Sequence, residues 1–180
     1  MIKKLLFLGF LLSCLLGFSQ RYKSTNTYIK FFSDAPMEDI EAINENASSL
    51  VDLSNMAIVI VVPIKSFSFE KKLMEEHFNE NYLESEKFPK AIFKGKLVNW
   101  DGSNGITNAT AEGTLEMHGV TKDITIEGEL DFNGAELKLS TVFPIKLKDY
   151  KIKIPKAVFY NIAEEVEVTA NLEYSPYEKD

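Results

Sequence analysis

His77 and His118 are the only histidines in the chain, and histidine is the side chain best suited to acid–base chemistry or metal binding near neutral pH. A metal centre needs several converging ligands, yet neither residue belongs to a His-x-Glu or His-x-x-x-His motif. His118 instead stands in "LEMHGVTK", between two segments that alternate apolar and polar residues. We therefore predict no metal site and no cofactor. We expect His118 to form hydrogen bonds at a hairpin corner and His77 to lie on a helix surface or in partly buried packing.

Covalent catalysis has no sequence signature either. The serines lack a Gly-x-Ser-x-Gly elbow, and the single cysteine, Cys14, lies in an apolar leader. Most of the 27 Asp and Glu residues fall at outward positions of alternating segments, where solvation is their ordinary role. We predict that the protein is not an enzyme and has no catalytic residues.

Residues 1–19 have the features of a secretory signal peptide. The basic start "MIKK" precedes "LLFLGFLLSCLLGF", which is shorter than the roughly 20 residues that a transmembrane helix needs. We predict cleavage after Ser19, a periplasmic or secreted location, and one domain over residues 20–180. A lipoprotein anchored at Cys14 is the less favoured alternative, because apolar residues rather than a polar tether follow the cysteine.

The chain is acidic, with a formal net charge of −7, which disfavours binding to nucleic acid. Its lysines nevertheless concentrate in "KLKDYKIKIPK", namely Lys146, Lys148, Lys151, Lys153 and Lys156. Because they alternate with apolar residues, we interpret them as a lysine-faced strand edge or rim that prevents edge-to-edge pairing. A cationic rim that attracts an anionic headgroup is the alternative interpretation.

Most of the remaining chain is rich in Val, Ile, Thr and aromatic residues, which favour strands. The predicted strands cover residues 26–32, 57–69, 90–100, 113–119, 123–132, 135–147 and 164–174. Residues 38–53 are ambiguous, and we favour a strand followed by a loop. One apolar and one polar face recur along these segments, so we predict an all-β fold with about eight antiparallel strands closed into a barrel. The pair Asn133–Gly134 predicts a type I′ hairpin turn.

One segment, residues 70–86, has helical rather than strand periodicity, with Leu73, Met74, Phe78 and Tyr82 on one stripe. A lone amphipathic helix must cover an apolar surface, so we place it near one mouth of the barrel. The inward halves of the strands and the helix stripe then line the interior. The candidate wall residues are Phe67, Phe69, Leu73, Met74, Phe78, Phe93, Leu115, Met117, Ile124 and Ile126.

Two blocks of the sequence resemble the YceI-like family. The first is "HFNENYLESEKFPKAIFKG" (77–95), and the second is "GTLEMHGVTKDITIEGEL" (113–130). The resemblance implies an exported, lipocalin-like, eight-stranded antiparallel barrel that binds a polyisoprenoid or similar lipid in its interior and has no catalytic activity. The opening "YKSTNTYIKFFSDAP" departs from the family pattern, because it lacks both histidines that the pattern carries there.

We therefore expect a non-catalytic exported carrier that holds an elongated apolar ligand, a polyisoprenoid or another lipid. A structural envelope protein with a fully packed barrel is one alternative. A glycan-binding module is the other, and Trp100 and Tyr150 would be its exposed aromatic residues. A homodimer and a transient membrane-associated delivery partner are compatible with the carrier.

Overall fold

The computed structural model describes residues 21–34, 39–154 and 163–177. The predicted signal peptide, with Cys14, and Lys156 lie outside these residues. The described residues form ten strands: β1 (Arg21–Ser33), β2 (Ile40–Asn44), β3 (Ser48–Asp52), β4 (Ala57–Pro63), β5 (Ser68–Phe69), β6 (Lys90–Leu97), β7 (Gly105–Met117), β8 (Val120–Phe132), β9 (Leu137–Lys146) and β10 (Glu165–Pro176).

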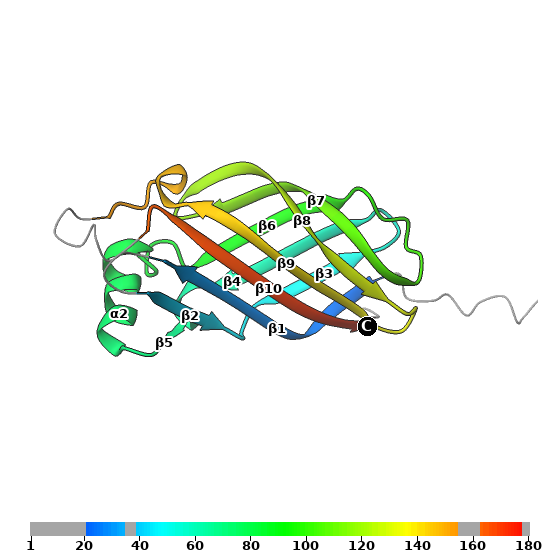
Figure 1. Ribbon diagram of the computed structural model, residues 1–180, viewed down its shortest axis with the longest axis horizontal. Helices are drawn as coiled ribbons and strands as arrows, with labels where there is room; N and C mark the ends of the chain where they lie inside the picture. The colour runs from blue at the N-terminus through cyan, green and yellow to red at the C-terminus, as the bar shows by residue number, and fades with distance from the viewer. Residues whose placement is uncertain (1–20, 35–38, 155–162, 178–180) are drawn as a thin grey trace, which may run out of the picture.

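The strands close into an antiparallel eight-stranded barrel, as the alternation predicted (Figure 1). Neighbouring strands follow the order β10-β9-β8-β7-β6-β4-β3-β1, and β1 then pairs with β10 to complete the ring. The β1–β10 ladder runs from Tyr22↔Pro176 to Phe32↔Glu167. This long pairing of the first and last strands removes two sheet edges that would otherwise be free to pair with other chains.

Residues 40–52 contain two strands rather than the predicted strand and loop. β2 and β3 pair with β1 in one continuous register, with Ile29↔Asn44 in one half and Lys23↔Leu50 in the other. Asn44 is the last residue of β2, and its side chain stabilises the turn that follows. Its Nδ2 donates to the carbonyl of Pro63 at 2.8 Å, and its Oδ1 accepts from the N–H of Asn46 at 2.9 Å.

The predicted strand over residues 57–69 is also interrupted. β4 ends at Pro63, a 3₁₀ turn covers Ile64–Ser66, and the short β5 then pairs with β2 instead of continuing beside β6. Proline has no N–H to donate to a sheet ladder, which explains why the strand ends there.

The type I′ turn is at a different hairpin from the one predicted. His118 and Gly119 form the two-residue connection between β7 and β8, and both have positive φ values, +52° and +71°. Both central residues of a type I′ turn require that conformation. Gly134 has a φ of +86°, but Asn133 does not have a positive φ. Instead the Asn133 Oδ1 accepts hydrogen bonds from the N–H groups of Ala135 and Glu136, which stabilises a longer loop.

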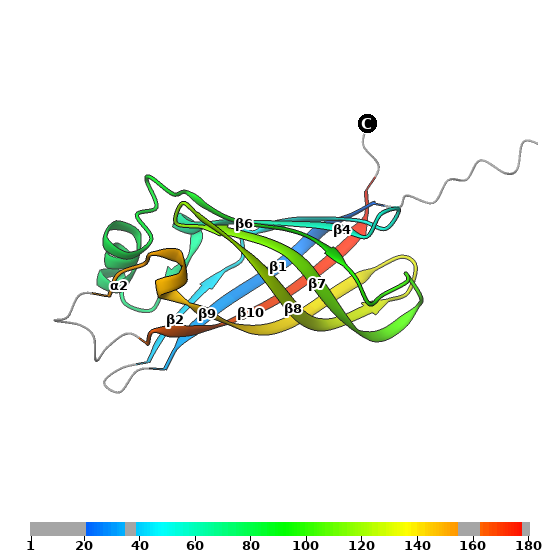
Figure 2. The ribbon, with the colours of Figure 1, turned by 90° about the horizontal axis from the view of Figure 1, so that it is seen from above.

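The barrel wall is not hydrogen-bonded all the way along β8 and β9. Their ladder covers only Glu129↔Ser140 to Phe132↔Leu137, although each strand continues well beyond it. Thr141 donates its hydroxyl to the carbonyl of Glu127 where the ladder stops. Pro144, which lacks an N–H, lies farther along β9 and fits a strand that has a free edge here. Figure 2 shows the two strands diverging toward the end of the barrel that carries α2.

The helical segment lies at that end, as predicted, but it is shorter. The α-helix α2 spans Lys72–His77 and passes into a π-helical turn, η2, over Phe78–Tyr82. A second short element, the 3₁₀ turn η3 (Leu147–Tyr150), follows β9 at the same end of the barrel (Figures 1 and 2). No helix in the described part of the chain is both long enough and apolar enough to cross a membrane.

Candidate functional site

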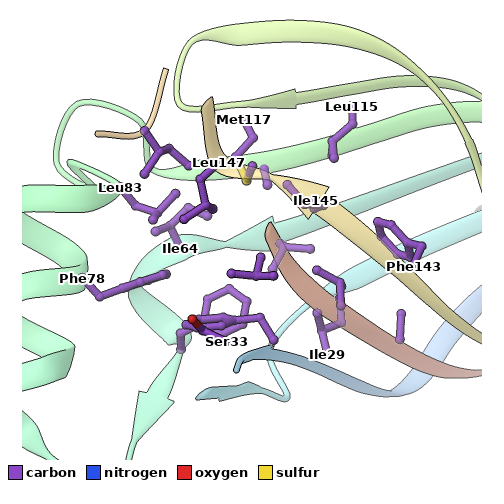
Figure 3. Close-up of a pocket in the computed structure, with 18 of the residues that line it drawn as sticks. Ile29, Ser33, Ile64, Phe78, Leu83, Leu115, Met117, Phe143, Ile145 and Leu147 are labelled. Carbon is purple, nitrogen blue, oxygen red and sulfur yellow. The ribbon is translucent and has the colours of Figure 1, made fainter. Parts of the chain in front are cut away.

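The barrel interior contains a cavity of about 370 Å³ with an almost wholly apolar lining (Figure 3). Its walls come from the inward positions of the strands and from the helical segment. Alternation places them there, because successive side chains of a strand point to opposite faces of the sheet. On β9, for example, Leu139, Phe143 and Ile145 line the cavity, whereas Val142 points outward and is 57% exposed.

Nine of the ten predicted wall residues line this cavity. They are Phe67, Phe69, Leu73, Met74, Phe78, Phe93, Leu115, Met117 and Ile126, and whether they contact a ligand stays a prediction. Ile124 does not line the cavity; it packs against the core from the part of β8 that has no β9 partner. We predicted only wall residues near the helix in sequence, so the prediction omitted the cavity-lining residues of β1, β4, β9 and β10. The missed residues include Ile29, Phe31, Ile58, Ile60, Val62, Phe143, Ile145, Val166 and Val168, which the same alternation could have identified.

Four phenylalanines hold the helical segment against the barrel. Phe78 stacks on Phe31 of β1 at a ring-centroid distance of 5.5 Å, and it also contacts Phe67 at 5.5 Å and Phe69 at 5.0 Å. Such aromatic pairs add stabilisation beyond the apolar area that they bury.

Leu73 also lines the cavity, yet it is 62% exposed. The cavity therefore reaches solvent beside α2.

The opposite end of the barrel is closed by aromatic side chains. Trp100 packs edge-on against Phe132 at 5.4 Å, and Phe132 packs edge-on against Tyr22 at 5.6 Å. The Trp100 Nε1 donates to the carbonyl of Ser103, and the Tyr22 hydroxyl donates to the carbonyl of Gly134. These hydrogen bonds satisfy the polar atoms of the cluster.

Both aromatic residues proposed for glycan binding are buried. Trp100 is 5% exposed and Tyr150 is 4% exposed. Burial raises the pKa of the Tyr150 hydroxyl, and the negative charge of Asp149 raises it further. Neither ring offers a face on which a sugar could stack, so the glycan alternative loses the two residues that suggested it.

Tyr174 of β10 is the most deeply buried of the tyrosines that the structure describes. Its hydroxyl lies 2.9 Å from the Ser49 Oγ, which itself donates to the carbonyl of Val59. Because the Ser49 proton is used in that bond, Tyr174 must be the donor between the two hydroxyls. Burial strongly raises the pKa of the Tyr174 phenol, and the hydrogen bond with Ser49 offsets this only in part.

His118 connects three segments at the α2 end. Its Nδ1 lies 2.9 Å from the carbonyl oxygen of Tyr150, and its Nε2 lies 2.8 Å from Oε2 of Glu84. The Tyr150 carbonyl can only accept, so Nδ1 donates to it, and Nε2 faces the Glu84 carboxyl group. The hairpin-corner role predicted for His118 thus includes contacts to two distant segments. In the same turn Gly119 is required for space, because a Cβ there would lie 2.5 Å from the Phe88 ring.

The lysine-rich segment does not form a continuous strand face. β9 ends at Lys146, which pairs with Glu165 of β10 at 4.0 Å, and Lys148 lies in η3. Lys151 and Lys153 follow this turn and line a separate polar hollow beside His118. The 3₁₀ turn breaks the alternation on which the strand-edge interpretation depended.

No aspartate or glutamate among the described residues lines the apolar cavity, and His77 is its only imidazole. Ser33 is the main buried polar group in its wall, and its Oγ accepts a hydrogen bond from the N–H of Ala163 at 2.9 Å. The described part of the chain also contains no group of three His, Cys, Asp or Glu side chains arranged to hold a metal ion. The cavity wall therefore offers apolar contact along its length and few polar groups for recognition.

Solved structures from three bacteria share this fold. A polyisoprenoid-binding domain from Saccharophagus degradans has a TM-score of 0.75 at 14% identity, with 89% of this chain and 99% of that chain covered. BcnA from Burkholderia cenocepacia has a TM-score of 0.70 at 18% identity, covering 82% and 95%. The YceI protein of Campylobacter jejuni has a TM-score of 0.63 at 17% identity, covering 79% and 88%. No curated protein matches the sequence. The YceI-like domain matches residues 23–174, and the chain therefore belongs to the YceI-like family.

Proposed function

We propose that this protein is a non-catalytic carrier that holds an elongated apolar ligand, a polyisoprenoid or another lipid, inside its barrel. The observation that carries the proposal is the continuous apolar cavity, which opens to solvent beside Leu73 at the α2 end. Its volume of about 370 Å³ falls in the range of roughly 300–1,000 Å³ that is usual for small-molecule pockets. Each buried methylene of a ligand chain would contribute about 0.8 kcal/mol.

The size of the cavity weighs against a packed structural barrel. A packed barrel would fill its interior with side chains, whereas the inward side chains here leave about 370 Å³ unoccupied. An apolar wall offers water few hydrogen-bond partners, so an apolar chain suits this space better than water does.

The structural relatives support the same class of ligand. One of them is a polyisoprenoid-binding domain, and an isoprenoid chain is a long run of methyl-branched apolar units that suits a cavity of this kind. The signal peptide over residues 1–19 remains a prediction, and so does a periplasmic or secreted location. In that setting a carrier would meet its lipid at a membrane, so a transient membrane-associated partner and a homodimer also remain predictions.

The decisive experiment is mass spectrometry of an organic extract from the purified protein, together with lipid binding by the delipidated protein. Ala111→Trp should fill part of the cavity, because Ala111 lies in its wall. Val142→Trp is the matched control, because Val142 points outward and is 57% exposed. We expect a stoichiometric single-chain lipid in the wild-type extract, reduced occupancy in Ala111→Trp and normal occupancy in Val142→Trp.

Circular dichroism must first show that both variants are folded, since added bulk in a core can itself destabilise. If the wild-type extract contains no lipid and the delipidated protein binds none, the carrier proposal is wrong. Equal loss of lipid from both tryptophan variants would mean that binding is not in the barrel interior.

A further inference from the structure

A second hollow lies at the α2 end of the barrel, next to the apolar cavity. Three segments form it: the end of η2 with the chain that follows it, the β7–β8 turn, and the chain that follows η3. They contribute Tyr82, Lys87, His118, Lys151 and Lys153, among others. We call this hollow the basic recess.

The basic recess and the apolar cavity share one wall. The Tyr82 side chain lines both hollows. Ile152 is 6% exposed and lines the cavity, whereas its neighbours Lys151 and Lys153 are exposed and line the recess. A molecule with an apolar chain in the cavity therefore has a basic surface within reach at the same end of the barrel.

The recess carries a local excess of positive charge in an acidic protein. Among the described residues, no carboxylate forms an ion pair with Lys151 or Lys153. The one carboxylate in the recess, Glu84, already contacts His118 at 2.8 Å and Lys87 at 3.9 Å. The formal charge of the whole chain is −7, so the sign of the recess is opposite to that of the molecule. Such a site selects anions by local charge.

Among its described lining residues, the apolar cavity has no positively charged site comparable to the basic recess where a charged group could bind. Its far end is closed by Trp100 and Phe132, which are both buried. A charge there would be desolvated without a partner, which is strongly unfavourable. A charged headgroup must therefore remain at the α2 end, where the basic recess lies.

We propose, on the basis of the carrier function proposed above, that the ligand is a single-chain amphiphile with an anionic headgroup, a carboxylate or a phosphate. The chain occupies the apolar cavity, and Lys151 and Lys153 hold the headgroup in the basic recess. Lys87 borders the same recess and adds to its positive charge. Tyr82 lines both hollows, so we expect the ligand chain to pass its side chain.

The test compares three probes with one chain length, hexadecanoate, hexadecyl phosphate and hexadecanol, on the full delipidated protein. We expect the wild-type protein to bind both anions about tenfold more tightly than the alcohol, as charge-assisted hydrogen bonds to lysine would give. In K151Q/K153Q this preference should disappear, while the dissociation constant for hexadecanol stays the same. High salt should reduce the preference, because the recess is open to solvent.

The matched control is K94Q/K96Q, which removes two exposed lysines of the same spacing from β6, away from both hollows. It should retain the wild-type preference. Equal loss in the two double variants would mean that only net charge matters and would overturn the assignment to the recess. Equal binding of all three probes by the wild-type protein would also overturn it while leaving the carrier function intact.

Two further outcomes complete the test. If no probe binds at all, the carrier function itself fails. Inorganic phosphate alone should bind weakly and compete poorly with hexadecyl phosphate, because the chain supplies most of the binding energy. If inorganic phosphate alone binds the recess as tightly as hexadecyl phosphate does, the recess is a free-anion site and the headgroup proposal is wrong.

Discussion

The Nε2 atom of His118 lies 2.8 Å from Oε2 of Glu84, and this contact joins the β7–β8 turn to the chain that follows the helical segment. The other ring nitrogen, Nδ1, contacts the carbonyl of Tyr150, the last residue of η3. One side chain, only 10% exposed, thus ties together the three segments that surround the α2 end of the barrel.

His118→Asn tests this connection. Asparagine tolerates the left-handed backbone that His118 adopts, so the turn should be retained while at least one of the two contacts is lost. We expect the free energy of unfolding to fall by about 1–3 kcal/mol, measured by denaturant titration, with lipid occupancy unchanged. A double-mutant cycle with Glu84→Gln should show coupling between the two positions. Independent, additive effects would mean that the His118–Glu84 contact contributes nothing.

Phe78→Ala should release the helical segment from the barrel. Phe78 is 8% exposed and lies in the cluster of four phenylalanines, so we expect a loss of about 3 kcal/mol in unfolding free energy. Leu73→Ala is the matched control, because Leu73 also lines the cavity but is 62% exposed, and it should cost less than about 0.5 kcal/mol. Equal costs for the two changes would contradict the anchoring role of Phe78.

Met117→Ala and Phe93→Ala should enlarge the cavity and change the chain lengths that bind. Each side chain lies in the cavity wall. Phe93 also fills the space above Gly95, where a Cβ would lie 2.7 Å from its ring, so its removal should cost more stability than removal of Met117. We expect the lipids bound by both variants to shift toward longer or bulkier chains, as measured by mass spectrometry. An unchanged lipid profile in both folded variants would argue that the chain lies elsewhere.

Tyr174 should make the protein sensitive to alkaline pH. Burial raises the pKa of its phenol in the folded state, so above about pH 10 the unfolded chain loses this proton first. The stabilising contribution is complete below pH 10 and decreases as pH rises above it, by up to about 1.4 kcal/mol per pH unit. Tyr174→Phe should show a shallower alkaline loss of stability than the wild-type protein. Identical pH profiles above pH 10 would show that Tyr174 ionises freely in the folded state.

Several features of this protein follow from the sequence alone, because only one of the two faces of each strand is apolar and that face must point inward. The alternation around Leu115 and Ile126 is enough to predict that both residues face the interior, and both line the cavity. The same reasoning placed a hairpin at His118–Gly119 and a helical segment near a mouth. Two predictions were wrong where an asparagine side chain forms hydrogen bonds with the backbone. Asn44 does so at the break between β2 and β3, where we predicted one strand and a loop. Asn133 does so in the β8–β9 loop, where we predicted a type I′ turn.

Other features depend on contacts between residues far apart in the chain, and no local pattern encodes them. Glu84 meets His118 only because the chain after η2 folds over the β7–β8 turn, and Lys151 joins them from beyond η3. The short β8–β9 ladder depends on how the whole ring of strands closes. Whether the barrel is packed or hollow depends on the enclosed volume relative to the summed volume of the inward side chains. Periodicity identifies which side chains point inward, but only the closed tertiary structure determines how much space they leave.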